Sequence, residues 1–229
     1  MLLQCETHDG TCGEGWGLAE RWLHPETLES LVELNELCLG LFAEQAAVRC
    51  AQPSVLLRQV GELWRLLDAA ARRRAAACPY LLVDAGFADP QRWRQPAPLG
   101  VGDAGEAAYG TFFTVAGATE VARLVFTYAW HLARAHGAAA RLLLGMSAPC
   151  AALIAHLSLR QIHSLAQTHP HWLRPRWPAR VQVWRELLLA AASGEAPVLE
   201  RARLHGLTLL AADARASLPE RSDAGALGP

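Results

Sequence analysis

The stretch AAARLLLGMSAPCAALIAHLSLRQIHSLAQT, residues 138–168, reads as three short helical segments separated by two clear breaks. Gly145 ends the first segment, because glycine readily adopts the left-handed conformation that closes a helix. Ser147 and Ser158 are typical N-cap residues for the next two segments. We therefore predict helices over 138–144, 148–156 and 159–168. This succession is typical of a tri-helical helix-turn-helix unit, in which the third helix enters the DNA major groove.

The side chains of the third segment divide into an apolar and a polar face. We expect the apolar face to be buried, and it comprises Leu159, Ile162, Leu165 and Ala166. The polar face comprises Arg160, Gln161, Ser164 and Gln167. Arginine binds guanine at two points and glutamine binds adenine in the same way. We therefore predict that these four polar residues face bases, whereas the preceding segment, 148–156, is apolar and acts as scaffold.

The charge pattern also favours a polyanionic partner. Residues 121–185 contain eight arginines, six of the nine histidines and no aspartate or glutamate, although the whole chain has a net charge of −1. A surface of one sign attracts an oppositely charged polymer. We predict phosphate contacts by Arg141, Arg174, Arg176 and Arg180. RNA and an acidic protein surface are open alternatives to DNA at this point.

A family resemblance lies in the same region. Leu144-Gly145, then twelve residues, then Ser158-Leu-Arg-Gln-Ile-His-Ser-Leu165 resembles the helix-turn-helix of FlhC, a subunit of the bacterial flagellar master regulator. The resemblance covers roughly thirty residues and implies transcriptional regulation. FlhC-type proteins also have a C-terminal four-cysteine zinc site, whereas the last cysteine here is Cys150. The resemblance therefore extends neither to that zinc nor to a partner subunit of the FlhD type.

The rest of the chain predicts an all-α protein in two parts. Leucines at helical spacing indicate one helix from Pro25 and another from Pro53 to Arg74, which we expect to pair as an acidic hairpin over 23–77. Segment 78–84 could be a short strand or buried extended chain, and the prolines and glycines up to 117 indicate a connector, 78–117. A basic helical domain would occupy 118–214, with helices over 118–136, 179–192 and 197–214 besides the three above. We expect a flexible arm over 1–22 and a disordered tail over 215–229.

Several classes of function are disfavoured by the same sequence. We find no apolar run of about 18 residues, so we expect no membrane span, and the first residues do not resemble a signal peptide, which favours a cytoplasmic protein with reduced cysteines. Cys5, His8 and Cys12 fit no common zinc spacing, so we predict neither metal nor cofactor. The polar residues match no catalytic motif, and we expect a non-enzyme.

Two functions follow as hypotheses. The first is a DNA-binding transcriptional regulator that associates with a second copy or a partner subunit through the leucine-rich segment 25–74. The alternative is a non-catalytic adaptor whose basic helical domain docks onto an acidic protein partner. Exposure of the polar face of 159–168 would favour the first, whereas coverage of that face by 179–192 would exclude it.

Overall fold

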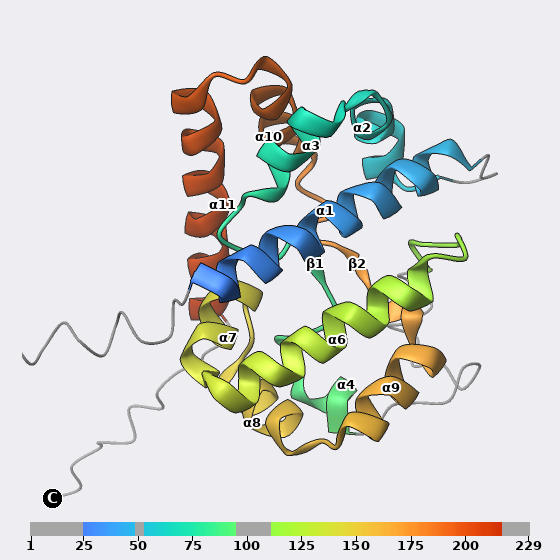
Figure 1. The fold of residues 1–229 in the computed structure, drawn as a ribbon, viewed down its shortest axis with the longest axis vertical. Helices are drawn as coiled ribbons and strands as arrows, with labels where there is room; N and C mark the ends of the chain where they lie inside the picture. The colour runs from blue at the N-terminus through green and yellow to red at the C-terminus, as the bar shows by residue number, and fades with distance from the viewer. Residues whose placement is uncertain (1–24, 49–52, 95–110, 217–229) are drawn as a thin grey trace, which may run out of the picture.

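The computed structural model describes residues 25–48, 53–94 and 111–216, and this part of the chain is all-α (Figure 1). The helices are α1 (Pro25–Ala47), α2 (Val55–Leu66), α3 (Ala69–Ala76), α4 (Pro90–Arg94), α6 (Ala118–Ala135), α7 (Gly137–Leu144), α8 (Ala148–His156), α9 (Leu159–Thr168), α10 (Val181–Ser193) and α11 (Ala196–Ala216). A 3-10 turn, η1 (Pro170–Trp172), follows α9. Strands β1 (Val83–Asp84) and β2 (Arg174–Pro175) pair antiparallel, with Val83 opposite Pro175. None of the helices in the described ranges is long and apolar enough to cross a membrane.

The ends of α7, α8 and α9 follow from local chemistry. Gly145 has a φ of 66° and closes α7, as expected for a left-handed C-cap. The Ser147 side chain accepts from the Cys150 backbone N–H at 3.3 Å, and Ser158 does the same for Gln161. Helices α8 and α9 therefore have the predicted bounds, and α7 begins one residue earlier than predicted.

The single helix predicted from Pro53 to Arg74 is wrong, because the chain breaks at Leu67. This residue has an extended backbone and a buried side chain. The next residue, Asp68, is the N-cap of α3, and its carboxylate accepts from the Ala71 backbone N–H at 2.6 Å. Aspartate favours such a cap over a helix interior, because its short side chain competes for backbone hydrogen bonds. The hairpin partner of α1 is consequently two helices joined at an angle.

Segment 78–84 is buried extended chain that ends in the short strand β1. Its backbone is held by Asn35 of α1, which is fully buried. The Asn35 amide donates to the carbonyl oxygens of Ala76 and Tyr80 at 3.0 and 2.9 Å, and its oxygen accepts from the Leu82 N–H at 2.8 Å. A buried asparagine with three partners meets its hydrogen-bonding needs, so this arrangement fixes the segment against α1.

The described residues share one hydrophobic core, to which the predicted N-terminal hairpin and the predicted C-terminal domain both contribute residues. Helix α10 packs on α2 and α3, and α1 packs on α6. The ring of Phe42 from α1 lies 4.9 Å from Trp64 of α2 and 5.1 Å from Trp184 of α10. The described residues of the predicted connector contribute Tyr80, Phe87 and Phe113 to the same core. Prolines and glycines indicate where a chain turns, but they do not indicate whether it is buried.

Candidate nucleic-acid interface

Helix α9 is supported by α6, against which α7 and α8 also pack (Figure 1). The turn between α8 and α9 is fixed by Trp130 of α6, whose indole N–H donates to the Leu157 carbonyl oxygen at 2.7 Å. A half-buried tryptophan offers both a large apolar contact and one directed hydrogen bond. The angle at which α9 leaves this turn is therefore set by α6.

The first turn of α9 is closed by a capping box. The Ser158 hydroxyl accepts from the Gln161 N–H at 3.3 Å, and the Gln161 side-chain oxygen accepts from the Ser158 N–H at 2.8 Å. The same oxygen of Gln161 also accepts from the Ser158 hydroxyl at 2.9 Å. This reciprocal pair satisfies two backbone donors at the start of the helix. Gln161 was predicted to face bases, and the structure instead engages its side-chain oxygen in the cap.

The polar face of α9 is exposed. Ile162, Leu165 and Ala166 are buried, as predicted, and they lie on the face toward α6. Leu159 was predicted to be buried and is 43% exposed, because it is the first residue of the helix and lies beyond the edge of this contact. Four polar side chains are exposed, namely Arg160, Gln161, Ser164 and Gln167. Arg160, Ser164 and Gln167 are spaced by four and three residues, so they share one stripe.

Arg176 does not lie on this surface. The prediction that it contacts phosphate is wrong, since its side chain is buried with only 6% of the residue exposed. Its guanidinium donates to the carbonyl oxygens of Leu81, Val83 and Leu144 at 2.7, 3.0 and 2.8 Å. Burial lowers the pKa of Arg176, and Asp84 opposes this effect. An arginine offers five N–H donors, and here they connect the extended segment 78–84 to the end of α7.

The other three predicted phosphate contacts are not gathered around α9. Arg180 is exposed, but its guanidinium lies 3.6 Å from the carboxylate of Asp213 on α11. Arg174 is half-buried and lines a pocket with Asp213. Arg141 is exposed on α7 and lines a neighbouring pocket with Ala214 of α11. In Figure 1, α7 and α9 lie at opposite ends of α6, with α8 between them.

One basic group near α9 was missed by the sequence prediction. The guanidinium of Arg134, in the last turn of α6, lies over the ring of Trp130 at 4.9 Å. Trp130 holds the turn that begins α9, so Arg134 places a positive charge beside that turn. The separation of four residues between Trp130 and Arg134 is the sequence signal for this contact, because such residues are neighbours on a helix.

The described residues include side chains of the metal-ligating types and three free thiols. They contain no group of three or more His, Cys, Asp or Glu side chains that could hold a metal ion. Burial raises the pKa of Cys38 and Cys78 to about 12 and that of Cys150 to about 11, so these three thiols are protonated at neutral pH. The possible ligands Cys5, His8 and Cys12 lie outside the described residues, as do most of the predicted arm and tail.

Comparisons of the chain with protein-family models, with curated protein sequences and with solved structures give no match.

Proposed function

We propose that this protein binds duplex DNA, with α9 as the helix that enters the major groove. The observation that carries the proposal is the stripe of Arg160, Ser164 and Gln167, which is exposed along a helix whose start is fixed by a capping box. Helix-turn-helix readers present the exposed face of a third helix in this way. The weak resemblance of residues 144–165 to the helix-turn-helix of FlhC points the same way.

Base contacts are assigned to the three residues of the stripe. Arg160 is placed at the helix start, the end that faces bases in helix-turn-helix proteins. Gln167 has the donor and acceptor needed for adenine. The Gln161 oxygen is engaged in the cap, so we assign Gln161 the role of holding the first turn of α9.

Phosphate contacts are assigned to groups beside α9. Arg134 is exposed at the turn held by Trp130 and meets a phosphate of the strand that flanks the groove. The absence of acidic residues from 121–185 removes local repulsion of the DNA backbone. Arg176 makes no phosphate contact in this proposal, because its guanidinium is hydrogen-bonded to the carbonyl oxygens of Leu81, Val83 and Leu144.

Alanine variants on two faces of the protein test this assignment by fluorescence anisotropy with random-sequence duplex DNA. Arg134→Ala is expected to weaken binding to all sequences and to lower the slope of log affinity against log salt by about one unit. Arg160→Ala on a selected sequence is expected to cost about 1–3 kcal/mol of discrimination. Arg185→Ala is the matched control, since Arg185 is an exposed arginine of the same acid-free segment on α10.

If the three variants Arg134→Ala, Arg160→Ala and Arg185→Ala lose the same DNA affinity, the special role of α9 is contradicted. The hypothesis that the protein binds DNA non-specifically would still stand. Unchanged binding in Arg134→Ala and Arg160→Ala would place the DNA site elsewhere on the molecule.

The alternative function, an adaptor for an acidic protein, is favoured by a different surface. Leu142 of α7 is 46% exposed beside the exposed Arg141, and both line a mostly apolar pocket with Pro149 and Ala211. An apolar patch with a basic rim suits a protein surface better than a phosphate backbone. Loss of partner capture in Leu142→Asp, with DNA binding unchanged, would support this function.

A further inference from the structure

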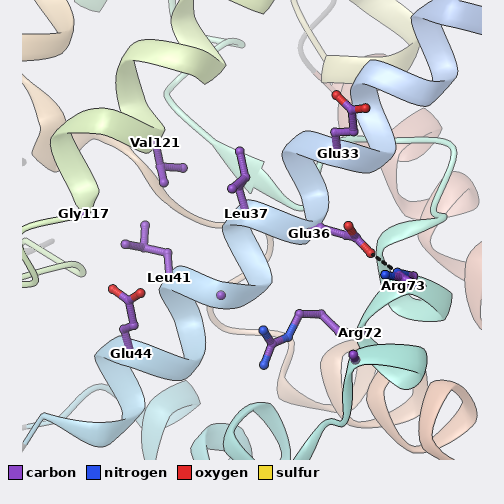
Figure 2. A pocket seen from close by; sticks show the side chains of 11 residues that line it. Glu33, Glu36, Leu37, Leu41, Glu44, Arg72, Arg73, Gly117 and Val121 are labelled. Carbon is purple, nitrogen blue, oxygen red and sulfur yellow. Dashed lines mark ion pairs between the residues drawn. The ribbon is translucent and has the colours of Figure 1, made fainter.

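A groove of about 570 Å³ lies where α1, α3 and α6 meet (Figure 2). Glu33, Glu36 and Glu44 project from α1 along one side, and Arg72 and Arg73 come from α3 on the other. Gly117 and Val121 belong to the beginning of α6. The volume falls within the range of about 300–1,000 Å³ that is usual for small-molecule sites.

Two of the charged groups in this groove already have partners. The guanidinium of Arg73 lies 3.6 Å from the Glu36 carboxylate, an ion pair drawn in Figure 2. One oxygen of Glu36 is thereby engaged, and the pair contributes no net charge to the groove. The remaining charges of the groove are those on Glu33, Glu44 and Arg72.

Arg72 is the group that points to a ligand. Its Nε is buried and donates to no acceptor in the part of the chain that the structure describes. None of the ion pairs among the described residues involves its guanidinium, which extends toward α1 in Figure 2. Arg72 lines the groove, where a bound carboxylate would pair with the terminal nitrogens of its guanidinium through charge-assisted hydrogen bonds.

Glu44 supplies the opposite charge. An oxygen of Glu44 lies 3.5 Å from the point where a Cβ on Gly117 would be, so this carboxylate faces the beginning of α6. Gly117 caps α6 without any side-chain hydrogen bond. Glu33 belongs to the same helix but lies about 16 Å from Glu44 at a rise of about 1.5 Å per residue, so it does not meet the same small molecule. A simple anion would meet repulsion from Glu44, whereas a simple cation would meet Arg72. A molecule that carries both charges meets neither penalty.

An apolar surface lies beside these charges. Leu37 is 46% exposed, although most other leucines of α1 are buried in the core. Together with Leu41 and Val121 it forms the apolar wall of the groove. A Cβ placed on Gly40 would meet no atom within 4 Å, so the groove is open above this residue. The groove thus combines the Arg72 guanidinium, the Glu44 carboxylate and an apolar wall.

We propose that this groove binds a zwitterion of the α-amino-acid type with a large apolar side chain. The carboxylate of the ligand pairs with Arg72, and its ammonium group lies toward Glu44. The apolar side chain covers Leu37, Leu41 and Val121.

The position of the groove also connects it to the proposed DNA site. Val121 and Gly117 belong to the beginning of α6, and α6 carries Trp130, which fixes the turn before α9. A ligand that binds one arrangement of α1 and α6 more tightly than another would be coupled to α9 through α6. This coupling rests on the proposed DNA-binding function, whereas ligand binding itself does not.

Isothermal titration calorimetry with free amino acids tests the binding. Heat of binding is expected for tryptophan, phenylalanine or leucine and not for glycine, which has both charges and no side chain. Tryptamine and indole-3-propionate each keep the indole and lack one of the two charges. Both are expected to bind roughly tenfold or more weakly than tryptophan, since each leaves one charged group of the groove unpaired.

Two variants locate the site, each with its own control. Arg72→Gln removes the charge that pairs with the carboxylate and is expected to weaken binding about tenfold or more, whereas Arg58→Gln on exposed α2 is expected to leave it unchanged. Gly40→Phe fills the groove without altering any charge and is expected to abolish binding, whereas Gly40→Ala leaves room for the ligand.

Absence of heat with every amino acid would overturn the proposal, as would full binding in both Gly40→Phe and Arg72→Gln. The coupling is measured separately by DNA anisotropy with and without the bound amino acid. If the protein binds the amino acid but has no affinity for DNA, the DNA-binding function is refuted and the ligand site stands.

Discussion

The guanidinium of Arg176 holds two segments of backbone together. Two of its acceptors, Leu81 and Val83, belong to the extended segment 78–84, and the third, Leu144, is the last residue of α7. The backbone oxygen of Arg176 in turn accepts from the indole N–H of Trp184 on α10 at 2.7 Å. A charged donor that satisfies several buried carbonyls is strongly stabilising in place, because its removal leaves those acceptors without partners.

Arg176→Met is therefore expected to destabilise the protein by about 3–5 kcal/mol, which urea unfolding followed by circular dichroism measures as a lower midpoint. Arg180→Met is the control, and it is expected to change stability by less than about 1 kcal/mol, since the Arg180–Asp213 ion pair is roughly half exposed. Equal midpoints for the two variants would contradict the structural role of Arg176.

Sequence alone could not separate these two arginines. Arg176 follows Pro175 and Arg180 lies two residues after Pro178, in the same acid-free stretch, and arginine is usually exposed. Only the pairing of β1 with β2 brings Arg176 to the carbonyls of residues nearly a hundred positions away. By contrast, Arg160 was correctly placed on an exposed face, because helical spacing relates it directly to the apolar residues around it.

At the scale of single helices, two glycines illustrate opposite reasons for a glycine in a helix interior. Gly40 of α1 faces open space, and a Cβ there would meet nothing within 4 Å. Gly206 of α11 lies against the Tyr80 hydroxyl, so a Cβ there would collide with the tyrosine ring. The first glycine weakens its helix without a packing reason, and the second permits α11 to approach the core.

We predict that Gly40→Ala stabilises the protein by roughly 0.5–1 kcal/mol, because alanine has the higher helix propensity. Gly206→Ala is expected to destabilise it by about 1–3 kcal/mol through overpacking. Thermal unfolding should show a higher midpoint for the first variant and a lower one for the second. A shift in the same direction for both would contradict the packing of α11 on Tyr80.

The helices that sequence predicted well are those with local end signals. Gly145 ends α7 through its left-handed φ angle. Ser147 and Ser158 begin α8 and α9, because each side chain accepts a hydrogen bond from the backbone N–H three residues later. Asp68 carries the same kind of signal for α3, but the leucine stripe continues across it and favoured one long helix. Periodicity detects which face is apolar, and it does not detect a change of helix direction at a buried Leu67.

For the molecule as a whole, the shared core has a chemical consequence. Cys38, Cys78 and Cys150 come from α1, the extended segment and α8, and all three thiols are buried. Burial raises their pKa to about 12, 12 and 11, above the ordinary thiol value near 8.5. At pH 8 the thiolate fraction in the folded protein is therefore very small.

Alkylation by iodoacetamide at pH 8 should consequently be slow at these three residues in native protein and fast in urea, as peptide mass spectrometry measures residue by residue. Because a raised folded pKa favours the protonated thiol, their contribution to stability is present below about pH 8.5 and is lost as the pH rises toward 12. Rapid native labelling at Cys38 alone would indicate that α1 separates from the core.

The arrangement of the whole molecule could not be predicted from local patterns. Helix α10 packs on α2 and α3, and the aromatic contacts of Trp184 with Phe42 and Trp64 connect residues more than a hundred positions apart. Nothing in the spacing of either segment specifies its partner. The prolines and glycines of 78–117 suggested a connector between two parts, whereas the core is continuous across the described residues.

Fluorescence anisotropy of the purified full chain with random duplex DNA, titrated at several salt concentrations, tests the central claim most directly. We predict binding that falls steeply and linearly on a plot of log affinity against log salt, because phosphate contacts release condensed counterions. Anisotropy that stays flat even at low salt would contradict DNA binding by α9.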